Sequence, residues 1–361
     1  MPKLPKNYKG GLLIPDHFEP SEYLAGAISG IVHEDRNTTG DWTSFLPTDE
    51  SQRFKYFDDY GCVTHSGENS LEIQLEFLQK SELMRKEDYE WLNYNGYTDE
   101  NGFNFDDRSI VVLSGTIPNQ GNYVHKVWDA FRKIGLIPPD LIPFNSEWRL
   151  QDYYSKDDFP PIAYNKGQEF LKRFWIQYER VLANDFEKAL KHAPLIVGVP
   201  TCPGWDYSDI VPACNRSANH ATILVKMDER YYHIYDSYEP YIKRLPRAYN
   251  IQFAYKGLIT PITNVSGEDK ADQYIFNNDL EFGDYSNEVT ELSKRLILEN
   301  TLVSPNPPNP HYSPEIVQAV RGYMAKYKIG SWWENNIYPR GRRVGPKIRQ
   351  HLNTNQFKSQ N

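Results

Sequence analysis

Residues 62–80 have the sequence CVTHSGENSLEIQLEFLQK, which begins with a cysteine and continues in an amphipathic pattern. Leu71, Leu75 and Leu78 follow one another at steps of four and three, so they share one face of a helix. The stretch therefore predicts a helix that begins at Cys62. A helix N-terminus lowers the pKa of a thiol and makes it more reactive. A buried structural cysteine is the alternative interpretation of this position.

The elements expected after this helix change in type along the chain. Residues 122–133 and 168–191 carry helical patterns, the first ended by Gly135 and the second near Pro194. From there on, short apolar runs predict strands at 194–200, 221–225, 231–235 and 251–255. Helices first and strands later predict an α+β domain.

The length of 361 residues suits one large domain and a smaller one. Residues 1–50, rich in proline, glycine and charge, predict an extended arm, and residues 51–262 form the expected large domain. A polar linker is expected at 263–278. Helical periodicity returns in residues 279–361, which predicts a small helical domain at the C-terminal side.

Charge and hydropathy argue against two classes of protein. The net charge of −8 gives no overall attraction for nucleic acid. The sequence has no run of about 18 apolar residues, so we expect no membrane span. The first nine residues lack the apolar stretch of a secretory signal. We therefore expect a protein that stays in the cytoplasm until lysis or is carried in a virion.

The chain contains three cysteines, Cys62, Cys202 and Cys214. An odd number argues against a disulfide framework, and spacing alone leaves open whether Cys202 and Cys214 pair. There is no CxxC pair and no HExxH motif, so we predict no metal site and no other cofactor.

A histidine and an aspartate are expected to meet at the end of one hairpin. His220 lies where a loop enters the strand 221–225, and Asp236 follows the strand 231–235. Opposed residues of a hairpin lie about 5 Å apart, so the carboxylate can reach the imidazole. Such a pair beside a thiol supplies a base and the group that orients it. A solvated hairpin with a chance His and Asp is the alternative.

Two other histidines lie near these elements. His65 follows Cys62 by three residues, where we expect it to pack or to face solvent. His233 is expected on the sheet face opposite Tyr232, because successive strand residues alternate between faces.

Several segments resemble the papain-like family of cysteine peptidases. Segment 62–72 is similar to the family's nucleophile helix in its cysteine, its Ser66 and its Leu71-Glu72 pair. Segment 219–221, Asn-His-Ala, and segment 236–238, Asp-Ser-Tyr, resemble its Asn-His-Ala and Asn-Ser-Trp segments. The resemblance covers about residues 45–260. It implies a papain-like fold, with a helical half and an antiparallel β half. It also implies a catalytic triad of Cys62, His220 and Asp236.

The chain departs from the family's pattern at the site. Asp236 stands where the family has Asn, and a carboxylate can also orient an imidazole. Val63 replaces an aromatic residue, and Tyr238 replaces Trp. The family's oxyanion glutamine lies six residues before the cysteine, where this chain has a tyrosine. Gln52, ten residues before the cysteine, is the candidate for that role, together with the backbone N–H of Cys62.

Residues 279–361 resemble the three-helix, peptidoglycan-binding-like module of lytic enzymes. The matching features are a Phe-Gly-Asp turn at 282–284, the helix 316–324 and the Val-Gly-Pro of 344–346. The resemblance implies binding to peptidoglycan, and a helical module that binds protein is the alternative. Five basic residues form either a solvated face or a surface for an anionic polymer: Arg340, Arg342, Arg343, Lys347 and Arg349.

The sequence thus predicts a cysteine endopeptidase acting on a protein or peptide substrate, encoded by a phage and associated with the cell wall. One alternative is an inactive papain-like scaffold that serves as a structural or adhesion protein of a virion. Val63 and the displaced Gln52 favour that alternative. Another is a wall amidase or acyltransferase that uses the same Cys–His chemistry.

Overall fold

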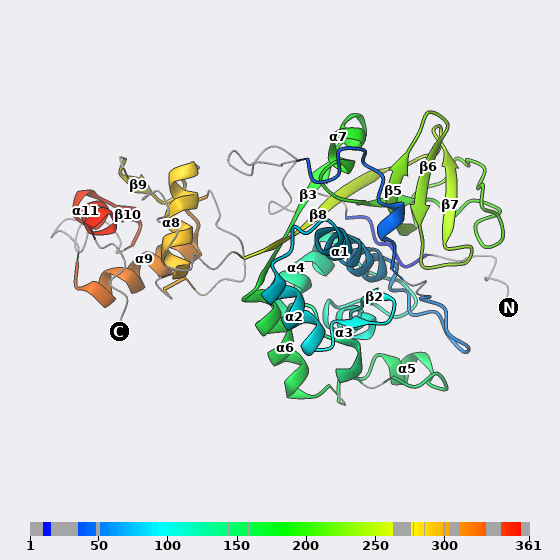
Figure 1. The fold of residues 1–361 in the computed structure, drawn as a ribbon, viewed down its shortest axis with the longest axis horizontal. Helices are drawn as coiled ribbons and strands as arrows, with labels where there is room; N and C mark the ends of the chain where they lie inside the picture. Colours follow the sequence, from blue (N-terminus) through cyan, green and yellow to red (C-terminus); the bar gives the residue numbers. More distant parts are fainter. Residues whose placement is uncertain are drawn as a thin grey trace. The chain divides into compact units, whose positions relative to one another are not determined.

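A computed structural model describes residues 10–15, 35–47, 51–142, 144–157, 159–262, 276, 278–284, 286–298, 301–302, 311–329 and 341–354 (Figure 1). The described residues form two compact units, the first within residues 10–262 and the second within 276–354.

The first unit has helices in its earlier part and an antiparallel sheet in its later part, which is the expected α+β class. Its helices are η1 (Thr43–Phe45), α1 (Cys62–Lys80), α2 (Lys86–Tyr94), α3 (Asp107–Leu113), α4 (Val124–Ile134), η2 (Pro139–Leu141), α5 (Leu150–Tyr153), α6 (Pro161–Leu171), η3 (Ala183–Asp185) and α7 (Phe186–Leu190). Its strands are β1 (Thr98–Asp99), β2 (Gly102–Phe103), β3 (Phe174–Val181), β4 (Leu195–Val199), β5 (His220–Met227), β6 (Tyr231–Tyr235), β7 (Ile242–Pro246) and β8 (Phe253–Pro261).

Six strands form one sheet in the order β3-β8-β4-β5-β6-β7, and every neighbouring pair is antiparallel. The hairpin of β5 and β6 pairs Ile223 with Tyr235 and Leu224 with Ile234. This register brings the start of β5 next to the end of β6. The first residue of β5 is His220, so the hairpin positions the predicted histidine and aspartate as neighbours.

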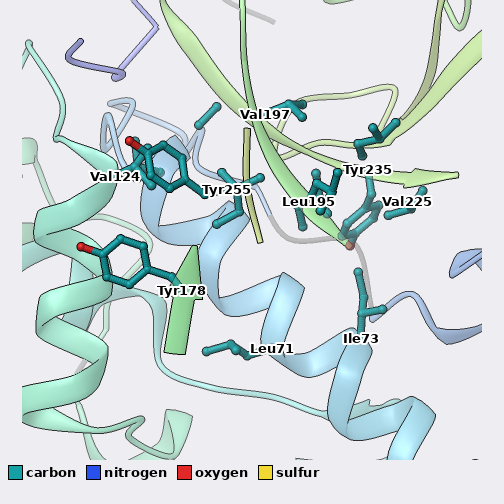
Figure 2. Packing of buried hydrophobic residues seen from close by; sticks show 14 of the residues in the cluster. Leu71, Ile73, Val124, Tyr178, Leu195, Val197, Val225, Tyr235 and Tyr255 are labelled. Carbon is teal, nitrogen blue, oxygen red and sulfur yellow. The ribbon is translucent and has the colours of Figure 1, made fainter. Parts of the chain in front are cut away.

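Helix α1 lies between the sheet and the helices α2, α3 and α6, as Figure 1 shows, and contacts β4, β5 and β8 as well as α3 and α4. Figure 2 shows Leu71 and Ile73 of α1 in the same apolar cluster as Leu195 and Val225 of the sheet. On its other side α1 approaches α4 so closely that a Cβ on Gly67 would lie 2.5 Å from the ring of Phe131. Because both sides are covered, the helix is held firmly, and its first residue with it.

The expected helix at 168–191 is wrong over its middle part. Residues 174–181 form β3, which pairs with β8 along its whole length, from Phe174 opposite Pro261 to Val181 opposite Ala254. Its sequence FWIQYERV is rich in aromatic and β-branched residues, and its burial largely alternates. Pairing with β8, distant in sequence, outweighs the weak helical pattern. Strand β7 was not expected at all, since its sequence IKRLP carries two charges.

The second unit contains α8 (Asn287–Leu298), α9 (Pro314–Tyr327) and α11 (Pro346–Thr354), with the short strands β9 (Leu280–Glu281) and β10 (Arg343–Val344) paired antiparallel. Val289 and Leu292 of α8 and Ile316 and Val320 of α9 are buried in one cluster. The expected linker at 263–278 lies outside the described residues except for Phe276 and Asn278. Phe276 belongs to the same cluster.

The basic residues of this unit do not form one free face. Arg343 and Arg349 both bind the carboxylate of Asp279, at 2.8 and 2.7 Å. Arg342 stacks on the ring of Phe282. Arg340 lies outside the described residues.

Candidate active site

The loop before α1 is shaped by two aspartates. The Oδ1 atom of Asp58 accepts a hydrogen bond from the N–H of Tyr60 at 2.9 Å, and Oδ1 of Asp59 accepts one from the N–H of Gly61 at 2.7 Å. The next residue, Cys62, is the first of α1 and is fully buried. Its thiol therefore lies at the positive end of the helix dipole.

His220 and Asp236 are in direct contact. The Nε2 atom of His220 lies 2.6 Å from Oδ1 of Asp236, and both side chains are buried. The imidazole lies near two aromatic rings, edge-on to Trp205 with centroids 5.3 Å apart and tilted on Tyr238 with centroids 5.1 Å apart. Tyr238 thus covers the pair, where the papain-like pattern has a tryptophan. Trp205 was missed, because its loop carries no local pattern that points to the site.

The thiol lies beside the residue that follows the histidine. The backbone N–H of Ala221 donates to Sγ of Cys62 across 3.4 Å. The Nδ1 atom of His220 is buried, and no hydrogen bond reaches it from the parts of the chain that the structure describes. With Nε2 committed to Asp236, Nδ1 is the ring nitrogen that remains for proton transfer. Cys62, His220 and Asp236 therefore come together from α1, β5 and the end of β6.

Gln52 is buried close to this group, but its amide is fully engaged. Its Nε2 donates to Oδ1 of Asp58 at 2.9 Å and to the hydroxyl of Tyr238 at 2.6 Å. Its Oε1 accepts from the hydroxyl of Ser237 at 2.6 Å. In this arrangement Gln52 joins the loop before α1 to the segment after β6. Donation to an oxyanion would require one of its two donors to change partner.

A lysine that sequence reasoning missed completes the surroundings of Asp236. The Nζ atom of Lys243, on β7, lies 2.7 Å from Oδ2 of Asp236. Burial by itself would raise the pKa of Asp236, but the Lys243 ammonium and His220 hold it at about 2. The carboxylate therefore stays ionised. Each of its oxygens accepts a hydrogen bond from a different side chain, one from His220 and the other from Lys243.

A segment from the N-terminal arm covers the thiol. The Sγ atom of Cys62 donates to the carbonyl oxygen of Gly10 at 3.5 Å. Gly11 has φ +45°, and a Cβ there would lie 2.5 Å from the carbonyl oxygen of Tyr60 and 3.2 Å from Sγ of Cys62. A Cβ on Gly121 would lie 1.7 Å from the oxygen of Gly11. Only glycines allow the backbone to pass so close to the sulfur.

Backbone hydrogen bonds hold this segment on both sides. The N–H of Asn122 donates to the oxygen of Gly11 at 2.9 Å, and the N–H of Leu13 donates to the oxygen of Asn122 at 2.8 Å. On the other side, the N–H of Leu12 donates to the oxygen of Asn219 at 3.3 Å. Residues 10–13 are thus held by backbone groups on both sides, with a bend at Gly11.

The surroundings of the covered thiol favour its protonated form. Burial raises the pKa of Cys62 well above its usual value, against the effect of the Ala221 N–H, and the carboxylates of Asp58 and Asp236 add to the rise. A helix N-terminus and an imidazolium both lower the pKa of a thiol. While residues 10–13 are in place, burial raises the pKa of Cys62 by more than these two effects lower it.

Comparison with known proteins gives structural matches only. No protein-family model matches the sequence, and a search of curated proteins also finds no match. Similar solved structures include xylellain, a cysteine protease from Xylella fastidiosa, with 16% identity over 72% of this chain and 98% of that chain and a TM-score of 0.44. The bromelain protease from Ananas comosus, in complex with E64, has 12% identity over 61% and 96% and a TM-score of 0.37.

A third match is procathepsin L 3 of the Tenebrio molitor larval midgut, with 16% identity over 66% and 75% and a TM-score of 0.40. These neighbours are papain-like cysteine proteases.

The two other histidines considered as candidates, His65 and His233, contact aspartates outside the candidate site. His65 is buried between Asp59, at 2.9 Å from Nε2, and Asp107, at 3.1 Å from Nδ1. Burial would lower its pKa, but the two carboxylates raise it well above its usual value. His233 contacts Asp228 at 2.6 Å on the exposed side of the hairpin. Both ring nitrogens of His65 are therefore committed to carboxylates.

Cys202 and Cys214 form a disulfide, which settles the pairing that spacing left open. It closes the loop that carries Trp205. Within the described parts of the chain, no group of three or more His, Cys, Asp or Glu side chains is placed to hold a metal ion. No helix among the described residues is long and apolar enough to cross a membrane.

Proposed function

We propose that this protein is a papain-like cysteine peptidase and that residues 10–13 must leave the thiol before a substrate can bind. The observation that carries the proposal is the convergence of three groups. Cys62 begins a helix and contacts the residue after His220, and His220 turns its other nitrogen to Asp236. This is the arrangement of a nucleophile, a base and the group that orients the base.

The proposed reaction uses these groups in turn. The Cys62 thiolate attacks the carbonyl carbon of a peptide bond, and the backbone N–H of Cys62 stabilises the oxyanion that forms. The protonated His220 gives its Nδ1 proton to the leaving amine as the C–N bond breaks, which leaves a thioester. Water then attacks the thioester and His220 takes its proton. The C–S bond breaks, the acid product leaves, and the thiolate and the protonated His220 are restored. Gln52 remains the candidate for a second oxyanion donor once its amide changes partner.

The edges that hold residues 10–13 support a peptide as substrate. Asn122 offers both its N–H and its carbonyl oxygen, and Asn219 offers its carbonyl oxygen. These groups bind a backbone without regard to side chains, so an extended peptide could replace the segment.

Labelling of the thiol tests this proposal. A papain-directed epoxide should alkylate Cys62 in a chain that lacks residues 1–15, with the adduct located by mass spectrometry. Cys62→Ala should abolish labelling and His220→Ala should slow it strongly. His233→Ala is the matched control, because its imidazole is held by Asp228, and should label normally. Labelling no faster than that of a free thiol would reject the peptidase.

The burial of Cys62 favours a second candidate, an inactive scaffold in which residues 10–13 fill the cleft permanently. In that case the thiol should stay unreactive, even when the segment is removed, and the protein should have a structural or adhesion role. The same labelling experiment separates the two candidates.

For residues 279–361 we propose binding to peptidoglycan, which would suit a phage-encoded enzyme released at lysis or carried in a virion. What supports it is the helical unit with the turn at 282–284 and a helix that begins after Val344-Gly345. The full-length chain should sediment with purified peptidoglycan. A chain that stays in the supernatant at low salt would contradict this proposal.

A further inference from the structure

Lys243 is a buried cation inside the candidate site. Its side chain is fully buried, and its Nζ contacts Oδ2 of Asp236 at 2.7 Å, the carbonyl oxygen of Pro240 at 2.6 Å and the carbonyl oxygen of Tyr238. An ammonium has three hydrogens, and these three acceptors use all of them. The ring of Trp205, 5.3 Å from Nζ, also lies edge-on to His220.

The two oxygens of Asp236 have different partners. Oδ1 accepts from Nε2 of His220 and Oδ2 from Nζ of Lys243. The carboxylate plane is therefore fixed from both sides, and the plane in turn sets the orientation of the imidazole. Because the three groups are buried, their charges act on one another with little screening.

We propose that Lys243 is a positioning residue of the Cys62–His220 pair, which locks the Asp236 carboxylate and offsets part of its negative charge at the imidazole. The inference rests on the proposed function. A buried aspartate alone would hold the protonated imidazole tightly and make it a poor acid toward the leaving amine. The nearby ammonium disfavours that second positive charge. The aspartate and lysine together then act on His220 more like a neutral hydrogen-bond acceptor.

Other charged groups surround this cluster and stay constant in the test. Arg53 and Asp206 contact each other at 3.4 Å and act on Lys243 with opposite signs. Asp58 and Asp59, in the loop before α1, act on Cys62. Because these groups are unchanged when Lys243 alone is replaced, a change at His220 reports the loss of the Lys243 charge.

The titration of His220 tests the inference without any substrate. We would label the histidine rings of the full-length chain with ¹³C, follow them by NMR against pH, and identify His220 with His220→Gln. Lys243→Met keeps the length of the side chain but removes its charge, and Lys243→Gln keeps a hydrogen-bond donor. In both variants the titration midpoint of His220 should rise by about one pH unit or more. A midpoint within about 0.3 unit of the parent chain, in folded variants, would overturn the inference.

A second comparison serves if removal of Lys243 leaves Asp236 unpaired and the chain unfolds. Asp236→Asn removes the negative charge but keeps an acceptor for His220. Compared with Asp236→Asn alone, the double variant Asp236→Asn/Lys243→Met should have a higher titration midpoint of His220. The reason is that the positive charge of Lys243, which disfavours a protonated imidazole, is removed. An unchanged midpoint in this pair would also overturn the inference.

The outcomes also distinguish this inference from the proposed function. A raised titration midpoint of His220 together with an unreactive Cys62 would uphold the role of Lys243 and reject the peptidase. A reactive Cys62 with an unchanged midpoint of His220 would support the peptidase and reject the role of Lys243. A residue with a merely structural role would lower the stability of the protein without moving His220.

Discussion

The thiol of Cys62 donates its hydrogen bond to the carbonyl oxygen of Gly10, 3.5 Å away, although Cys62 and Gly10 are far apart in the sequence. The contact is made by backbone on one side and by the candidate nucleophile on the other. It ties the reactivity of the thiol to the position of the N-terminal segment, because burial is the main cause of the raised pKa of Cys62.

Removal of the covering segment should make the thiol reactive. A chain lacking residues 1–15 exposes Cys62 to water, which lowers the thiol pKa and opens the cleft to reagents. We expect alkylation by the epoxide to be at least about ten-fold faster than in the full-length chain. The control lacks residues 1–9 and keeps Gly10, so it should react as slowly as the full chain. Equal rates in all three chains would contradict the covering role.

A single substitution should release the same segment. Gly11→Val places a β-branched side chain at φ +45°, where its Cβ would meet the oxygen of Tyr60 at 2.5 Å. We expect faster alkylation of Cys62 with little change in thermal stability of the first unit. Ile14→Ala, at a side chain that is 43% exposed, is the control and should leave the rate unchanged. A slow thiol in Gly11→Val would show that the segment stays in place.

Asp236 should contribute stability that is lost in acid. Its folded pKa, about 2, lies below its ordinary value of 3.8, so its contribution is present above the unfolded pKa and disappears as pH falls through about 2. Linkage makes this on the order of 2 kcal/mol. Urea unfolding between pH 6 and pH 2 should show a smaller loss of free energy in Asp236→Asn. Parallel pH curves for the two proteins would disprove this contribution.

Gly67 should not tolerate a side chain. In Gly67→Ala the new Cβ would lie 2.5 Å from the buried ring of Phe131, and we expect a loss of about 1–3 kcal/mol of unfolding free energy. Gly322→Ala, also inside a helix, has its nearest contact at 3.6 Å and should stabilise the second unit by about 0.5–1 kcal/mol. Thermal unfolding of both variants provides the measurement, and stabilisation in Gly67→Ala would show that α1 and α4 can separate.

The disulfide between Cys202 and Cys214 should stabilise the first unit. It spans a sequence separation of 12, and its loss should cost about 3 kcal/mol through loop entropy. The double variant Cys202→Ser/Cys214→Ser should unfold at a lower urea concentration than the parent chain, and a reducing agent should change only the parent chain. Free thiols at both positions in the native protein would contradict the pairing.

Local pattern was enough for the elements that depend on neighbours in sequence. The helix expected at 62–80 has the bounds of α1, and the strand expected at 231–235 has those of β6. The apolar spacing of a helix and the turn of a hairpin are both properties of consecutive residues. For the same reason, the hairpin pattern alone predicts that His220 lies near Asp236.

Long-range pairing decided the elements that were missed. Residues 174–181 pair with β8, whose residues come about 80 positions later in the sequence. No local pattern within residues 168–191 predicts that partner strand. β7 is short and charged, yet it brings Lys243 to Asp236 because it pairs with β6. A sequence contains these residues but not the distances between them.

The sequence by itself determined the α+β class, the start of α1 at Cys62 and the hairpin with His220 and Asp236, because each follows from spacing along a short stretch. Only the tertiary structure decided that Lys243 binds Asp236, that the amide of Gln52 is engaged, and that Gly10 covers the thiol. Each of these contacts joins segments distant in sequence, and such contacts form only when the packed core fixes both partners.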